Sequence, residues 1–200
     1  MEDIPLDDRL RKLVSELLQK NSITGNLEII EKTFNVVNAL MQYNQLDQTN
    51  PAEGFSQYLL FEGPPGNLKS VPAVYAMAVA KELAERSQKS VSFAKLDFKD
   101  AYEHGPIVAL RYNLKQISEG NQINILFLED IESKFPSQKA LYKPWHPEVI
   151  SEFIQFIYGV KYNNKGNFIM LATAQNLENI DPAIAIAFTR YKVDGLVTAK

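Results

Sequence analysis

The spacing of apolar residues divides this chain into two parts. In the first part they recur every three or four positions, the pattern of an amphipathic helix. The pattern predicts one helix with its apolar face on Leu6, Leu10, Leu13, Val14, Leu17 and Leu18, and a second with its inner side on Leu27, Ile30, Phe34, Val37, Leu40 and Met41. We therefore expect residues 1–50 to form an N-terminal helical extension that packs on a domain formed by residues 51–200.

In the second part, short apolar runs alternate with helical segments. The runs predict strands at 58–62, 91–96, 123–129, 168–172 and near 191–197, with helices at 70–86, within 98–118, at about 148–160 and from Asp181. Strands that alternate with helices form mainly parallel sheets covered on both faces. The predicted fold class is therefore α/β, a three-layer α/β/α sandwich around a five-stranded, mainly parallel sheet.

Composition and charge exclude several classes of function. The 200 residues carry a net charge of −3, and Lys and Arg are scattered among acids, so we expect no nucleic-acid partner. The absence of cysteine excludes disulfides, thiolate metal sites and cysteine nucleophiles. His104 and His146 are far apart and are expected in solvent-facing loops, which argues against a zinc site.

No segment has the length of apolar sequence that a membrane span requires, which is about 18 residues. The N-terminal stretch MEDIPLDDRL is acidic and has no apolar signal core. We therefore predict a cytoplasmic protein without membrane association.

The segment that follows the first predicted strand carries the clearest candidate chemistry. Residues 63–70, GPPGNLKS, approach the phosphate-loop pattern G-x-x-x-x-G-K-[ST] between a strand and a helix. In that pattern backbone N–H groups surround the phosphates, the lysine contacts the terminal phosphates and the hydroxyl binds Mg²⁺. The candidate binding residues are Gly63, Pro64, Pro65, Gly66, Asn67, Leu68, Lys69 and Ser70. Leu68 departs from the pattern, because it replaces the second glycine.

A pair of acids ends a second predicted strand. In residues 125–132, ILFLEDIE, Glu129 and Asp130 follow four apolar residues. A P-loop enzyme needs a carboxylate at such a position, to hold Mg²⁺ and to polarise the attacking water. The two segments together predict a site for ATP and Mg²⁺.

At this point the sequence resembles the AAA-type ATPases, in their large nucleotide-binding subdomain. LLFEGPPGNLKS resembles the Walker A segment and ILFLEDIES the Walker B segment, both in degenerate form. FIMLATAQNLENIDPAI resembles the sensor-1 strand and the turn after it, and the resemblance runs from about residue 56 to residue 195. It implies the P-loop NTPase sandwich.

The resemblance also implies roles for single residues. Glu129 takes the Mg²⁺ position, where the family has Asp, and Asp130 takes the water-activating position, where the family has Glu. Gln175, with Asn176 beside it, takes the position of the polar sensor of the γ-phosphate. Arg190 is the candidate for an arginine finger that reaches a neighbouring subunit.

The implied function is that of an ATP hydrolase that acts as a homo-oligomer and remodels another protein. The spacing between Tyr102 and Arg111 matches the family's substrate-pore loop and next helix, so a protein substrate would be gripped at Tyr102.

Several departures leave a second hypothesis open, a degenerate, non-hydrolysing scaffold that serves as a protein-interaction module. Leu68 and the inverted acidic pair affect the chemical step, and Pro72 implies a late or kinked start of the helix after the loop. Only one of the family's two arginines is present, since Ile186 and Thr189 stand where the other is expected. The chain also stops before the helical lid of the family, so no C-terminal lid is expected.

Overall fold

The computed structural model describes residues 27–52, 54–96, 105–139 and 143–193. The helix predicted within residues 6–18, the pore-loop candidate Tyr102 and His104 lie outside these ranges.

The core of the fold is a five-stranded sheet in which every strand pair is parallel, in the order β2-β3-β4-β1-β5. The strands are β1 (Tyr58–Glu62), β2 (Val91–Lys95), β3 (Ile123–Leu128), β4 (Phe168–Ala174) and β5 (Thr189–Lys192). β4 is two residues longer than predicted, because Thr173 and Ala174 pair with Phe61 and Glu62 of β1. The predicted parallel α/β sheet is confirmed.

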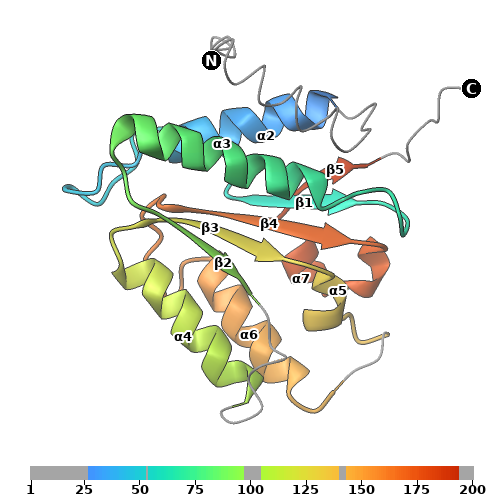
Figure 1. Ribbon diagram of the computed structural model, residues 1–200. Coiled ribbons are helices and arrows are strands. Elements are labelled where there is room, and N and C mark those ends of the chain that lie inside the picture. Colours follow the sequence, from blue (N-terminus) through green and yellow to red (C-terminus); the bar gives the residue numbers. More distant parts are fainter. Residues whose placement is uncertain (1–26, 53, 97–104, 140–142, 194–200) are drawn as a thin grey trace, which may run out of the picture.

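Helices cover both faces of the sheet (Figure 1). One face carries α2 (Leu27–Leu40) and α3 (Val71–Ser87), and the other carries α4 (Pro106–Glu119) and α6 (His146–Ile157). Three short helices, α5 (Ile131–Lys134), η2 (Leu177–Asn179) and α7 (Pro182–Ala185), follow the ends of β3 and β4. The structure is therefore the predicted three-layer sandwich.

Alternation along the strands explains why the sheet needs helices on both faces. In β1, Leu59 and Phe61 join the apolar cluster beneath α2 and α3, whereas Tyr58 and Leu60 join the cluster beneath α4 and α6. Successive side chains of a strand point to opposite faces, so a fully apolar strand has two faces to bury. Helix α2 belongs to one of these clusters and packs against α3.

Prolines mark the first turns of several helices. α3 begins at Val71, directly after Ser70, and Pro72 lies in its first turn, where a missing N–H costs no hydrogen bond. α6 begins at His146, two residues earlier than predicted, with Pro147 in its first turn.

The prediction that His146 faces solvent is wrong. Its side chain is buried, and its Nδ1 accepts a hydrogen bond from the Lys143 N–H at 2.7 Å. Burial, together with the nearby Lys143 charge, lowers the pKa of His146. His146 is thus a structural residue at the start of α6.

The layer formed by α4 and α6 contains a buried carboxylate. Glu152 is only 3% exposed, and it accepts hydrogen bonds from Arg111 Nε at 2.7 Å, from the Tyr162 hydroxyl at 2.6 Å and from Lys161. Burial alone would raise the pKa of Glu152, but these donors outweigh it and lower the pKa to about 2.

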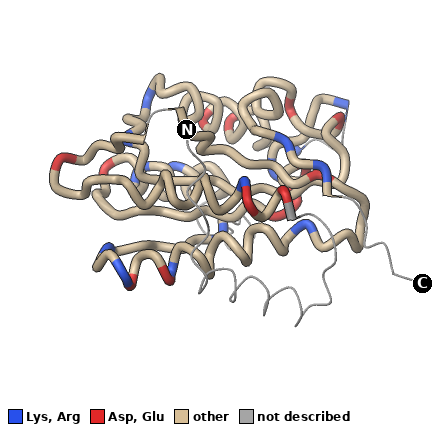
Figure 2. The backbone as a smooth tube through the Cα atoms, turned by 90° about the horizontal axis from the view of Figure 1, so that it is seen from above, with Lys and Arg blue, Asp and Glu red and all other residues tan. Residues whose placement is uncertain are grey.

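In the view of Figure 2, positions of Lys and Arg and positions of Asp and Glu are interspersed along the described backbone. Within the described residues, no helix is both long and apolar enough to cross a bilayer.

Candidate functional site

The candidate residues meet at the edge of the sheet where the strands end. The loop 63–70 follows β1, Glu129 follows β3 and Gln175 follows β4. Because the strands are parallel, all three positions lie at the same edge, which is where ligands bind in open α/β sheets. The strand order places the end of β4 between the other two.

Two hydrogen bonds fasten both sides of the site to β4. The Gly63 N–H donates to the Ala174 carbonyl at 3.1 Å, and the Asp130 N–H donates to the Thr173 hydroxyl oxygen at 3.1 Å. Thr173 is buried, and sequence reasoning missed it. Its signal was a hydroxyl near the end of an otherwise apolar strand, FIMLATA. The spacing between the loop and the acidic pair is therefore set through β4.

The start of the loop admits only glycine. A Cβ added at Gly63 would lie 2.6 Å from the backbone oxygen of Val193, closer than real contacts allow. The same oxygen accepts a hydrogen bond from Asn67 Nδ2 at 3.0 Å. Gly63 and Asn67 thus hold the loop against the residue that follows β5.

Leu68 has φ +55°, a left-handed conformation that costs little for glycine and more for a residue with a Cβ. This conformation explains why the phosphate-loop pattern has glycine there. The loop keeps this backbone geometry in spite of the substitution, and the leucine side chain is 40% exposed.

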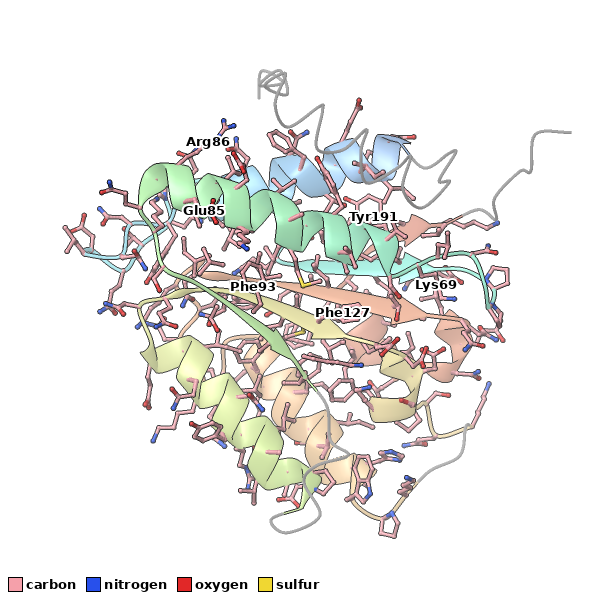
Figure 3. The ribbon with its side chains drawn as sticks, in the orientation of Figure 1. Lys69, Glu85, Arg86, Phe93, Phe127 and Tyr191 are labelled. Atoms are coloured by element: carbon pink, nitrogen blue, oxygen red, sulfur yellow. The ribbon has the colours of Figure 1, made fainter. Side chains whose placement is uncertain are left out.

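The loop offers donors for an anion. The backbone N–H groups of Gly66, Leu68, Lys69 and Ser70 have no hydrogen-bond acceptor within the described parts of the chain. They lie just before α3, whose dipole places partial positive charge at its N-terminus. Lys69 Nζ donates to the Pro64 carbonyl at 2.8 Å, within the loop itself. Figure 3 places Lys69 at the end of the sheet beside the start of α3. The loop therefore fits the phosphates of a nucleotide.

The two acids differ in their surroundings. Glu129 forms an ion pair with Lys95 of the neighbouring strand β2, with 2.5 Å between Oε2 and Nζ. Asp130 lies at the N-cap of α5 with φ +49°, and its carbonyl accepts hydrogen bonds from Ser133. Asp130 is exposed.

Hydrogen bonds position the two sensor candidates, Gln175 and Asn176, just after the end of β4. Glu132 Oε1 accepts from the Gln175 N–H at 2.7 Å and so links α5 to the end of β4. Asn176 caps η2, since its side-chain oxygen accepts from the Glu178 N–H at 2.9 Å. Glu132 is a second residue that sequence reasoning missed, because its partner is a backbone group 43 positions away.

The remaining candidate, Arg190, lies on the edge strand β5 and is exposed. Its Nη2 lies 3.5 Å from the Ala185 carbonyl, a contact too long to fix the guanidinium firmly.

The metal ligands that the sequence predicts are the Ser70 hydroxyl and the Glu129 carboxylate. Oxygen ligands suit Mg²⁺, which keeps several waters and is held mainly by substrate phosphates in such sites. Among the described residues, no group of three or more His, Cys, Asp or Glu side chains is placed to hold a metal ion. Ser70 and Glu129 fit Mg²⁺ only if the Glu129 carboxylate gives up its ion pair with Lys95 and binds the metal instead.

The parallel sheet, its strand order and the loop between β1 and α3 define a P-loop NTPase fold of the AAA type. Residues 59–194 match the family model described as "ATPase family associated with various cellular activities (AAA)". The chain belongs to this family.

Solved structures support the fold. A chain of the E. coli MS115-1 HORMA:CdnC:Trip13 complex superposes with a TM-score of 0.65 at 12% sequence identity, over 96% of this chain and 67% of that chain. No curated protein matches the sequence.

Proposed function

We propose that this chain binds ATP with Mg²⁺ and that, as a homo-oligomer, it couples hydrolysis to the remodelling of another protein. The observation that carries the proposal is the loop 63–70, which lies at the same end of the sheet as Glu129 and Asp130 and has four backbone N–H groups without an acceptor among the described residues. Membership of the AAA family supports nucleotide binding. The similar solved structure is a complex of several proteins, HORMA, CdnC and Trip13, and this supports a protein as the target.

In this proposal each residue has a separate task. The loop amides bind the phosphates, and Lys69 exchanges the Pro64 carbonyl for a terminal phosphate oxygen. Ser70 and Glu129 would hold Mg²⁺, which when bound neutralises phosphate charge. Asp130 orients the attacking water.

The remaining candidate residues have proposed roles towards the γ-phosphate or towards other chains. Gln175 and Asn176 would sense the γ-phosphate, and Arg190 would reach the site of a neighbouring subunit. The segment around Tyr102 would contact the protein substrate.

A second candidate function is a non-hydrolysing scaffold that binds partner proteins. The Lys95–Glu129 ion pair favours it, because the carboxylate assigned to the metal already has a protein cation. The short carboxylate of Asp130 favours it as well, since general-base geometry is sensitive to about 1 Å.

Binding of a fluorescent ATP analogue tests the main proposal. We expect binding that falls at least about tenfold in Lys69→Ala, because one charge-assisted contact to phosphate contributes about 1.5–3 kcal/mol. Lys81→Ala, an exposed lysine on α3, is the control for the loss of one positive charge. No binding at millimolar nucleotide by the folded protein would exclude the proposed nucleotide site and favour the scaffold.

A further inference from the structure

Just after the end of β3, Glu129 makes contacts with two lysines to which the AAA motifs assign no role. β2 and β3 pair in parallel with Lys95 opposite Phe127. Glu129 follows Phe127 by two positions, so the side chains of Lys95 and Glu129 both belong to the face of the sheet covered by α3. The Lys95 side chain therefore extends towards the neighbouring strand and contacts Glu129, with 2.5 Å between Nζ and Oε2.

A second lysine contacts the same residue. Lys134 of α5 is buried, and its Nζ donates to the backbone oxygen of Glu129 at 2.5 Å. Residue 129 thus receives one ammonium group at its carboxylate and another at its carbonyl. A divalent metal that approaches the Glu129 carboxylate is repelled by the Lys95 ammonium group.

Two further acids lie close to Glu129 in the sequence. Glu132 is engaged through Oε1 by the Gln175 N–H, and Asp130 lies one residue beyond the ion pair. The longer side chain of Glu129, where the resemblance expects Asp, also carries its carboxylate one methylene further from the backbone. This extra reach favours the contact with Lys95.

We propose that Lys95 is a built-in counter-ion for Glu129, so that nucleotide binds the loop 63–70 with little need for Mg²⁺ and a divalent metal must displace Lys95 from the carboxylate. The nucleotide part of this inference rests on the proposed function. The competition between Lys95 and a divalent metal does not involve nucleotide, so it is tested separately.

The strength of the competition follows from exposure. The side chains of Lys95 and Glu129 are 50% and 44% exposed, so solvent screens their attraction and the pair is reversible. Loss of one such pair should change metal affinity by about fivefold, the upper range for exposed ion pairs.

The direct experiment is a Mn²⁺ titration without nucleotide, followed by paramagnetic broadening of the amide signals of Asp130 and Gln175. We expect Lys95→Met to bind Mn²⁺ about fivefold more tightly than the wild type, and Lys95→Met combined with Glu129→Gln to lose that gain. Lys115→Met is the control for the loss of one exposed lysine, since Lys115 forms an ion pair with Glu119 on α4, with 3.8 Å between Nζ and Oε1, and the substitution should leave the titration unchanged.

The second experiment compares binding of the fluorescent ATP analogue with Mg²⁺ and with EDTA. We expect less than about a threefold difference in the wild type and a larger difference in Lys95→Met. Equal Mn²⁺ affinity, or no broadening, in both wild type and Lys95→Met would overturn the inference. Absence of nucleotide binding together with the Mn²⁺ gain would overturn the proposed function and leave the counter-ion standing.

Discussion

The two sides of the site differ in how far their polar groups are committed to the protein itself. On the β1 side, four backbone N–H groups of the loop 63–70 have no acceptor in the described structure, and Lys69 Nζ donates to a carbonyl of the loop itself. On the β3 side, Glu129 is already paired with Lys95. The difference teaches that the side proposed to bind phosphate keeps donors without a described acceptor, whereas the carboxylate proposed to bind metal is already engaged. In the proposed function, nucleotide binding and hydrolysis are therefore separable, and substitutions on the two sides test their separation.

The largest effect is expected at the acidic side. Asp130→Asn should lower ATP turnover by about 100-fold or more, because general-base catalysis contributes 10²- to 10⁴-fold. Binding of the fluorescent analogue should stay within about twofold of the wild type, because the carboxylate does not contact the loop donors. Steady-state phosphate release measures the first quantity. Turnover unchanged in Asp130→Asn would remove this residue from the chemistry.

Glu152, a buried carboxylate that accepts hydrogen bonds from three side chains, provides a reference for the exposed Glu129 pair. In Glu152→Gln, donors from Lys161, Tyr162 and Arg111 lose their charged acceptor, and we expect a loss of about 3 kcal/mol in unfolding free energy at pH 7.

The pH dependence has a defined sign. The pKa of Glu152 falls from 4.5 to about 2 on folding, so its stabilisation is complete above pH 4.5 and disappears as pH falls towards 2. The difference between wild type and Glu152→Gln in urea unfolding should shrink over that range. A difference that is constant with pH would contradict the role assigned to the charge.

The start of the loop should be rigid. Gly63→Ala places a Cβ against the Val193 backbone oxygen, and we expect it to lower the unfolding free energy by about 1–3 kcal/mol and to weaken nucleotide binding. Gly66→Ala is the control within the loop, because its Cβ would meet open space and its cost comes only from φ +85°. Urea unfolding of the two variants should rank Gly63→Ala as the more damaging.

The smallest effect is expected at the substituted position. Leu68→Gly keeps the left-handed backbone and removes the side chain beside the phosphate path, so nucleotide affinity should rise by about threefold, an effect below 1 kcal/mol. Leu46→Gly removes another exposed leucine, from a turn away from the site, and should have no such effect. No gain in Leu68→Gly would mean that the leucine does not obstruct the loop.

Much of the fold was predictable because its signals are local. Apolar runs such as INILFL marked the buried strands, and their alternation with helices implied the parallel sheet. The end of β4 was missed because Thr173 and Ala174 are weakly apolar, and only pairing with β1 extends the strand through them. His146 was misplaced because its burial depends on packing around the start of α6.

The site was predictable only where it is contiguous in sequence. The loop 63–70 carries its own pattern, and its position between β1 and α3 is confirmed by the structure. The contact between Lys95 and Glu129 joins positions 34 residues apart and depends on the register of β2 against β3. The Glu132 contact to Gln175 likewise depends on tertiary structure, because no sequence pattern specifies a bond to a distant backbone group.

The two hydrogen bonds to the end of β4 bear on how such a site changes during evolution. One is made by two backbone groups, Gly63 N–H and the Ala174 carbonyl, and the other by the Asp130 N–H and the Thr173 hydroxyl. Neither depends on the side chains of residues 68, 129 or 130. We therefore expect substitutions at those three positions to leave the frame of the site in place, so that the proposed catalysis can be lost or regained without refolding of the domain.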